Sequence, residues 1–129
     1  MPPSKPVHYT DGSNLQTSGG QTEGMLRQNA ITSVSENLCA SVMIAKPHSG
    51  SAIHHHGDQD TIVYAASGHG TVVSEGGRKR QVLKPGDFVL IPAYAEHQEV
   101  NDGDGEVKWI ITRSGTEPIV QNLDGWGTS

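Results

Sequence analysis

The sequence predicts an all-β domain, an antiparallel sandwich or barrel built from short strands. Glycine accounts for 16 of the 129 residues, while runs of the helix-favouring residues Ala, Leu, Glu and Lys are scarce. Short apolar segments recur between turn signals through the middle of the chain. Such short connections favour antiparallel pairing, because parallel strands need long crossovers. The length fits a single domain.

Eight strands are expected, and each is bounded by turn residues. Their ranges are Leu38–Ala45, Ala52–His56, Thr61–Ala66, Gly70–Ser74, Arg80–Leu83, Asp87–Ile91, His97–Asn101 and Glu106–Arg113. Alternation of apolar and polar side chains is clearest in the last strand, around Trp109. Three connections carry the glycine, proline or aspartate of tight turns: Glu75–Gly77, Lys84–Asp87 and Asn101–Gly105.

The strands are expected to form one barrel domain over residues 34–114, between two less apolar segments. Residues 1–33 are polar and rich in Ser, Thr, Gly, Gln and Pro, which predicts an N-terminal arm. This composition suits three arrangements: a loose arm, a cover over the barrel mouth, or a strand added to a neighbouring subunit. Residues 115–129 form a C-terminal tail with one large apolar residue, Trp126.

Composition and charge exclude several classes of partner. Nine Lys and Arg residues against 14 Asp and Glu give a formal net charge of −5, so we expect no nucleic-acid partner and no membrane partner. Cys39 is the single cysteine, which excludes an intramolecular disulfide and a cysteine-based zinc site. No apolar run resembles a secretory signal or approaches the roughly 20 residues of a membrane span. We therefore expect a cytoplasmic protein.

Three consecutive histidines, His54, His55 and His56, stand inside an expected strand. Because side chains alternate along a strand, His54 and His56 project to one face and His55 projects outward. Neutral imidazoles are good ligands for divalent transition metals, so this pair is a candidate chelating site. The alternative is a solvated histidine-rich strand, since a histidine tract is only a compositional signal.

A second motif strengthens the metal hypothesis. Gly86, Pro92, His97 and Asn101 follow the spacing G-x5-P-x-G-x2-H-x3-N, with Tyr94 in place of the middle glycine. This pattern resembles the cupin superfamily, and in particular its small single-domain members.

The first motif of that superfamily, G-x5-H-x-H-x3or4-E-x6-G, is matched in part. His54, His56 and Gly68 fit it, whereas the leading glycine is displaced to Gly50 and the glutamate is absent.

The position of the missing glutamate falls on Thr61, or on Asp60 with the shorter spacing, and Gln59 lies one residue earlier. Gln59 and Thr61 share a face by alternation, whereas Asp60 needs a local irregularity to reach it. We therefore expect a metal site of His54, His56 and His97, with the Gln59 amide oxygen as the first candidate for a fourth contact. Three neutral imidazoles leave the ion its full charge, which favours an anionic ligand.

The resemblance covers roughly residues 38–113 and implies a double-stranded β-helix, the jelly-roll form of the predicted barrel. It also implies a divalent transition metal inside the barrel near one mouth, with iron as first choice and Mn, Ni, Cu or Zn as alternatives. The expected wall around the metal is largely apolar, and it consists of Val42, Ile44, Val63, Phe88, Leu90, Trp109 and Ile111.

The resemblance further implies an enzyme that acts on a small oxygen-bearing molecule, and a dioxygenase is the first hypothesis, because cupins with three neutral histidines resemble oxygen-activating ones. A metal-dependent decarboxylase, lyase or isomerase on the same site is the second. A non-catalytic cupin that binds a small ligand is the third. A metal-free sugar-nucleotide epimerase would need a basic pocket for an anion, and Lys108 and Arg113 are few basic residues for such a pocket.

Three further residues are catalytic candidates. Tyr64 and Tyr94 are expected to donate a hydrogen bond or proton to bound substrate, and Glu96 is a candidate acid or base. The alternatives are packed aromatic rings and a solvated carboxylate, since alternation points Glu96 away from the metal face. We also expect a homodimer, formed through sheet edges or through the N-terminal arm.

Overall fold

The computed structural model describes residues 3–17 and 24–128, and β-strands dominate these ranges. Two short 3₁₀ turns, η1 (Gly12–Asn14) and η2 (Glu75–Gly77), are the helical elements there. The strands are β1 (Gln16–Thr17), β2 (Met25–Ile31), β3 (Leu38–Ala45), β4 (Ser49–Gly50), β5 (His54–His55), β6 (Thr61–Ser67), β7 (Gly70–Ser74), β8 (Lys79–Leu83), β9 (Phe88–Ile91), β10 (His97–Asn101), β11 (Val107–Ser114) and β12 (Gln121–Asn122).

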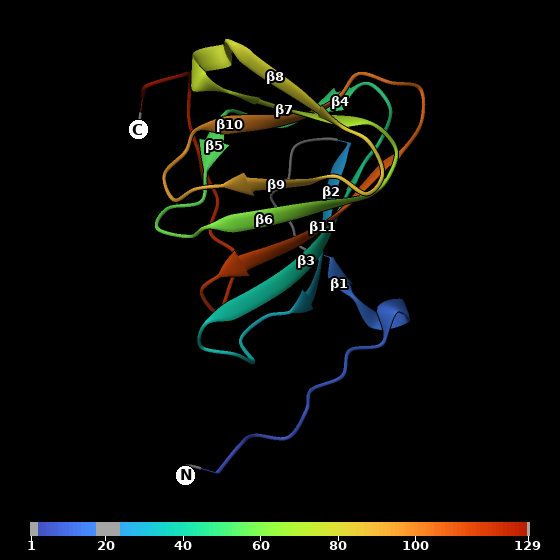
Figure 1. The fold of residues 1–129 in the computed structure, drawn as a ribbon, viewed down its shortest axis with the longest axis vertical. Helices are drawn as coiled ribbons and strands as arrows, with labels where there is room; N and C mark the ends of the chain where they lie inside the picture. Colours follow the sequence, from blue (N-terminus) through green and yellow to red (C-terminus); the bar gives the residue numbers. More distant parts are fainter. Residues whose placement is uncertain (1–2, 18–23, 129) are drawn as a thin grey trace.

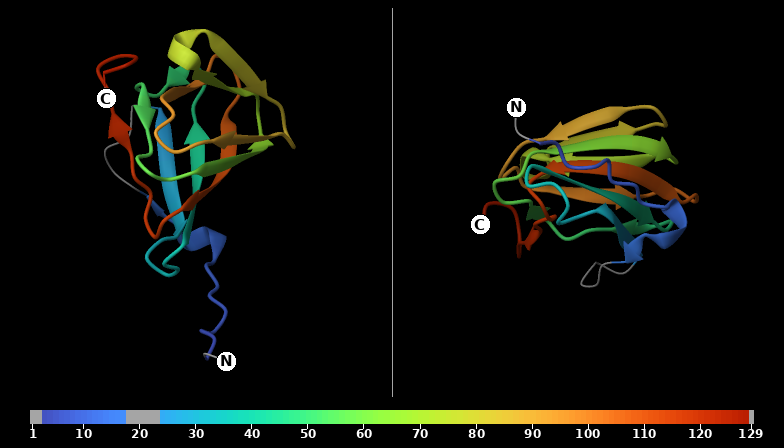
Figure 2. Two further views of the ribbon diagram at one scale, coloured as in Figure 1. Left: turned by 60° about the vertical axis from the view of Figure 1, so that its left-hand side comes forward. Right: turned by 90° about the horizontal axis from the view of Figure 1, so that it is seen from below.

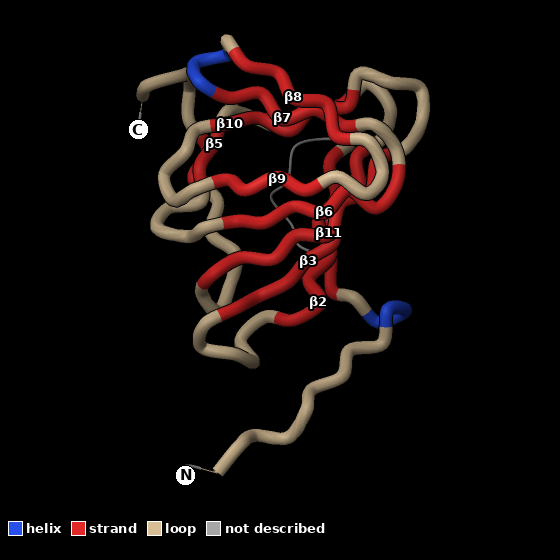
Figure 3. Tube along the Cα trace, viewed as in Figure 1, coloured by secondary structure: helices blue, strands red, loops and turns tan. Residues whose placement is uncertain are grey.

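Two antiparallel sheets face each other and enclose the core (Figures 1 and 3). One sheet has the order β1-β2-β3-β11-β6-β9, and the other has the order β12-β5-β10-β7-β8, with β4 also paired to β10. Consecutive strands therefore cross repeatedly from one sheet to the other, as Figure 2 shows from two further directions. This arrangement confirms the predicted all-β jelly roll.

The expected strands are all present, with small shifts at their ends. The largest difference is at Ala52–His56, where only β5 is a strand. The hairpin expected at Glu75–Gly77 joins β7 to β8 through η2. The Asn101 side chain organises the turn before β11: its Nδ2 donates to Gly105 O at 2.9 Å and to Ala45 O at 3.1 Å, so it also fastens this turn to the end of β3.

The inner faces of the strands form a core around Trp109, which is fully buried. Gly70 makes room for this ring, because a Cβ there would stand 2.6 Å from an indole carbon. The expected wall residues Val63, Trp109 and Ile111 do face inward. The core therefore draws on the inner faces of both sheets, through Val63, Trp109 and Ile111 of one and Val72 and Leu83 of the other.

Four expected wall residues lie on the outer face of their strand. Two of them are Phe88 and Leu90 in β9, where the more buried positions are Val89 and Ile91, and the other two are in β3. In β3 the buried side chains are Cys39, Ser41, Met43 and Ala45, so Val42 and Ile44 point outward. The expectation for these two was wrong because β3 is apolar on both faces, and alternation then does not indicate which face is buried.

Parts of the expected arm and tail belong to the sheets. Within residues 1–33, β2 pairs with β3 along most of its length, and β1 pairs with β2. Within residues 115–129, β12 pairs with β5. Residues 1–2, 18–23 and 129 of these segments lie outside the described residues. The stretch before η1 projects away from the barrel (Figure 1), and its Val7 side chain is 98% exposed.

In residues 3–17 and 24–128, no helix combines the length and the hydropathy needed to cross a bilayer.

Candidate metal centre

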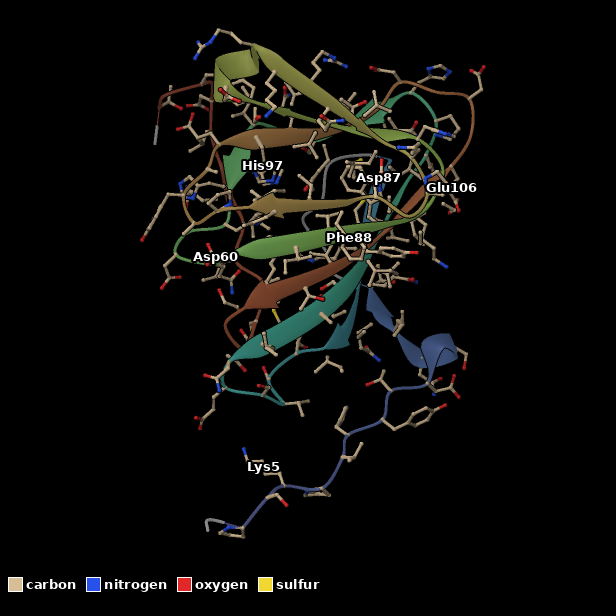
Figure 4. The ribbon with its side chains drawn as sticks, viewed as in Figure 1. Lys5, Asp60, Asp87, Phe88, His97 and Glu106 are labelled. Atoms are coloured by element: carbon tan, nitrogen blue, oxygen red, sulfur yellow. The ribbon has the colours of Figure 1, made fainter. Side chains whose placement is uncertain are left out.

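Two strands of the second sheet bring the three predicted histidines together. His54 lies in β5 and His97 in β10, and the two residues are partners in the antiparallel register. His56 follows β5 directly. All three side chains are at most 3% exposed, and Figure 4 shows the His97 ring between β10 and β9. Their ring centroids lie 4.3 to 4.9 Å apart.

Each of these rings is oriented by a backbone carbonyl. The Nδ1 atoms of His54, His56 and His97 lie 2.8, 2.8 and 2.9 Å from the oxygens of Ala52, Ile119 and Ala95 respectively. A carbonyl oxygen only accepts, so each Nδ1 carries the hydrogen and donates it. The Nε2 atom of each ring therefore keeps its lone pair, and this is the arrangement typical of metal-ligating histidines.

Glu99 is a fourth donor, and the sequence analysis missed it. Its Oε1 lies 3.5 Å from His54 Nε2 and 3.6 Å from His97 Nε2. One donor atom from each of these residues and from His56 lies within 4.8 Å of all the others. The signal was available, because Glu99 stands two residues after His97 in β10 and so shares its face.

The carboxylate and the imidazoles influence each other's protonation. Burial alone would raise the pKa of Glu99, but His54 and His97 beside it hold that pKa well below its ordinary value. Burial opposes a charge on His54, yet the nearby Glu99 carboxylate raises the pKa of that ring. For His56, burial and then the Arg113 guanidinium lower the pKa to about 3. His56 is therefore a neutral ligand at physiological pH.

Arg113 brings a positive charge to the same region. It is 4% exposed on the inner face of β11, and its Nη2 lies 3.5 Å from His56 Nε2. Burial lowers the pKa of Arg113 to about 10, against the opposing effect of Glu99. The guanidinium thus stays charged at neutral pH.

The structure gives Gln59 contacts that differ from those expected of a metal ligand. Its Nε2 donates to Glu117 O at 2.6 Å, and its Oε1 accepts from Ile119 N at 2.8 Å. Gly115 has a positive φ of 93° and leaves space for this amide, because a Cβ there would stand 2.5 Å from Gln59 Nε2. Both polar ends of the buried Gln59 side chain therefore hold the tail, next to the carbonyl that orients His56.

The other two positions considered for the missing glutamate have different surroundings. Asp60 is exposed, as Figure 4 shows near the start of β6, and its Oδ1 accepts from Ala93 N at 2.9 Å. Thr61 is 1% exposed on the inner face of β6, and its Oγ1 has no hydrogen-bond partner in the described chain.

A cleft of about 850 Å³ lies between β9 of one sheet and β7 and β8 of the other, and His97 is the residue of the cluster that lines it. Phe88 and Leu90, two of the expected wall residues, also line it while remaining more than half exposed. Tyr94 and Glu96 also line this cleft. A small organic molecule therefore has a route to the cluster.

The three catalytic candidates lie at different distances from this cleft. Tyr94 and Glu96 stand at its rim, and Glu96 Oε1 accepts from Gly127 N at 2.6 Å. Tyr64 is not among the residues that line the cleft; it packs on Phe88, with ring centroids 4.8 Å apart. Tyr94 has a φ of 62°, which explains why the motif carries glycine at this position.

His55 points away from the other histidines, as alternation requires, but it is not solvated. It is 8% exposed, its ring centroid lies 5.7 Å from that of Tyr94, and its Nδ1 accepts from Gly57 N at 2.9 Å. The expectation that it projects outward is thus met, and its low exposure goes with the pairing of β12 to β5, in which Gln121 is the register partner of His55.

The donor set suits a divalent transition metal. Imidazole nitrogens and one carboxylate are ordinary ligands of Fe, Mn, Ni, Cu and Zn. Separations of 3.5 and 3.6 Å between neighbouring donors fit metal bonds of roughly 2.0–2.2 Å. His97 Nε2 is buried and has no hydrogen-bond partner in the described chain. A buried nitrogen with a free lone pair is suited to bind a divalent ion.

Comparison with known proteins places this geometry in a family. The family model described as Cupin domain matches residues 41–113. Gentisate 1,2 dioxygenase 1 from Aquipseudomonas alcaligenes is 29% identical over 80 residues, which cover 62% of this chain and 22% of that protein. The chain thus spans about a fifth of the length of this curated relative.

Solved structures agree on the fold. The polyketide cyclase RemF from Streptomyces resistomycificus has a TM-score of 0.74 at 15% identity and covers 97% of this chain and 89% of its own. An oxalate decarboxylase from Lactobacillus farciminis has a TM-score of 0.75 at 19% identity and covers 86% of this chain and 34% of its own. Because the family model covers more than half of the sequence, and the histidine–glutamate cluster lies within the matched segment, the chain belongs to the cupin domain family.

Proposed function

We propose that the protein is a metal-dependent enzyme that acts on a small oxygen-bearing organic molecule, with dioxygenase activity as the first candidate. The observation that carries the proposal is the convergence of donor atoms from His54, His56, His97 and Glu99 within 4.8 Å, with His97 lining the cleft. Iron is the first candidate metal, and Mn, Ni, Cu and Zn suit the same donors. The bound ion would polarise a substrate oxygen as a Lewis acid or, as iron, support oxygen chemistry.

The chain's own residues supply the surroundings. The Nδ1–H bonds to backbone carbonyls hold the three rings in one orientation before any ligand arrives. Apolar side chains such as Leu90 and Ile91 line the cleft and exclude water around a bound substrate. Tyr94 and Glu96 are proposed to contact the substrate at the rim, where a hydroxyl and a carboxylate exchange protons or hydrogen bonds.

Sequence similarity to a gentisate dioxygenase supports oxygenation. Glu99 supports the second candidate, a decarboxylase, lyase or isomerase. Glu99 would hold a bound ion together with the three histidines, and its negative charge would offset part of the charge of that ion. A fourth protein ligand would leave less room for a chelating substrate and oxygen together, which favours Lewis-acid chemistry on the substrate alone.

The test begins with metal content. Protein purified without added metal is analysed for bound ions, beside His97→Ala and the control His69→Ala, whose histidine is exposed. We expect about one ion per chain in the wild type and in the control, and a loss in His97→Ala. Oxygen uptake is then measured with gentisate, diketones, flavonols, thiols and small hydroxy acids, and carbon dioxide release with small organic acids.

Oxygen uptake that depends on His97 supports the dioxygenase, and metal-dependent conversion without oxygen supports the second candidate. The proposal of a metal enzyme is contradicted if the purified protein contains no metal and binds none of added Fe, Mn, Ni, Cu or Zn, and if His97→Ala leaves its activity unchanged. The remaining hypothesis is then a cupin that binds a small ligand without catalysis.

We also propose that the protein forms a homodimer through its N-terminal arm. Residues 3–9 extend away from the barrel (Figure 1), and Val7 and Tyr9 are 98% and 80% exposed. An extended segment with exposed apolar side chains is suited to pair with the sheet edge of a second copy.

A further inference from the structure

Arg113 has a buried charge with too few partners. It is 4% exposed, and its Nε and Nη1 atoms are buried without a hydrogen-bond acceptor. Among the described residues, no Asp or Glu forms an ion pair with it. In residues 3–17 and 24–128, the hydrogen-bonding contact found for Arg113 is the 3.5 Å approach of its Nη2 to His56 Nε2. Burial of a guanidinium with unfilled donors is costly, so it calls for an explanation.

The neighbours of Arg113 include a second unpartnered group. Thr61 is its partner in the register between β11 and β6, so both side chains point into the barrel. The Oγ1 of Thr61 is buried and, in the described chain, lacks a hydrogen-bond partner. A guanidinium and a hydroxyl, both able to donate, therefore come from neighbouring positions of the two strands, and the guanidinium approaches His56.

Metal binding would leave Arg113 with even fewer partners. The Nε2 lone pair of His56, which now faces Nη2, would be used by the ion. The Glu99 carboxylate, the nearby negative charge of the cluster, would be drawn to the ion as well. One carboxylate cannot balance a divalent ion and a guanidinium together, so the loaded site would keep an excess of positive charge.

We propose that Arg113 anchors a carboxylate group of the substrate beside the metal ligands, with the Thr61 hydroxyl as a second donor. A carboxylate is planar and has two oxygens, which match the paired N–H groups of a guanidinium. The substrate class is therefore small organic acids that carry a further oxygen next to the carboxylate. This inference rests on the proposed function, because the second oxygen is assigned to the metal.

The test compares acids with their uncharged amides. Glycolate against glycolamide, and salicylate against salicylamide, differ in the carboxylate alone. Binding is measured by calorimetry to metal-free and zinc-loaded protein, for the wild type, Arg113→Met, Arg113→Lys and the exposed control Arg78→Met. Zinc content and thermal unfolding are recorded for each variant.

The wild type and Arg78→Met are expected to bind at least one acid about tenfold or more tightly than its amide. Arg113→Met should retain zinc, lose this preference and unfold at an equal or higher temperature, because an apolar side chain replaces a buried unpaired charge. If Arg113→Met does not fold, Arg113→Lys decides the question. Lysine keeps the positive charge but lacks the paired N–H donors of a guanidinium, so the preference for acid over amide should fall by at least severalfold.

An undiminished preference for acids in the folded Arg113 variants overturns the inference, as does a wild type that binds zinc and treats acid and amide alike. A wild type that binds no metal contradicts the proposed function alone. The inference is then decided on the metal-free protein: a preference that disappears in Arg113→Met supports it, and an absent preference overturns it.

Discussion

The chemistry of the cluster depends on how each side chain is held. The Nδ1–H of each of the three histidines binds a carbonyl, so all three rings turn the same nitrogen to the centre. Glu99 is held between two of them at 3.5 and 3.6 Å. It makes the cluster a mixed nitrogen and oxygen site with one negative charge, and this is the combination that discriminates least among Fe, Mn and Zn.

Glu99→Gln should lower the affinity for a divalent ion by about 10- to 100-fold or more, because a charged donor is replaced by a neutral amide. The measurement is zinc and manganese titration of metal-free protein by calorimetry. Glu106→Gln is the matched control, since Glu106 is exposed and lies on the turn before β11 (Figure 4). Equal affinities in all three proteins would show that the ion is held by the histidines alone.

Spacing in the sequence identified His54, His56 and His97, because metal ligands on strands recur at fixed intervals. Glu99 was missed because a carboxylate was sought near the first histidine pair, where the motif places it, and not on the strand of His97. The role of Gln59 could not be predicted for a different reason. Its contacts are with Glu117 and Ile119 of the tail, and strand alternation does not indicate where in the fold a C-terminal tail packs.

At the scale of elements, prediction worked where one face of a strand is apolar and failed where neither face stands out. The last strand alternates clearly, and its buried positions were identified. The strand β2 was included in the predicted arm. Its central residues Arg27, Gln28 and Asn29 are polar on both faces of the strand, so no row of apolar side chains marks it. Asn29 instead accepts a hydrogen bond from Ser41 of β3 at 3.2 Å.

The tail is an element whose attachment can be tested. Gln59→Leu leaves Ile119 N and Glu117 O without their partner, and we expect it to reduce the free energy of unfolding by about 1–3 kcal/mol. Urea unfolding of the metal-free protein measures this. Gln81→Leu on the exposed strand β8 should change stability by no more than about 0.5 kcal/mol.

Faster metal dissociation should accompany the loss of stability in Gln59→Leu, because Ile119 O orients the His56 ring. Wild-type stability in Gln59→Leu would mean that the tail is held by its other contacts, among them the 2.8 Å bond from Leu123 N to Ile53 O.

At the scale of the whole molecule, the arm and the barrel are separable. Removal of residues 1–11 takes away the exposed extended stretch and leaves β2 in its sheet. We expect this shortened protein to be monomeric where the full chain is dimeric, with an unchanged thermal unfolding temperature of the barrel at low concentration. Sedimentation at several concentrations measures the mass of both. A dimer that survives the deletion would exclude the arm as the contact.

Strand β5 has only two residues, joined to β10 at a single register pair and to β12 on its other side. The segment that carries two of the proposed ligands is thus among the most weakly anchored parts of the barrel. Without an ion, its amides should exchange with deuterium well before those of β11, which is paired along both edges. Occupation of the centre would link β5 to β10 through side chains, so slowed exchange in this one stretch would report binding even when no substrate is known.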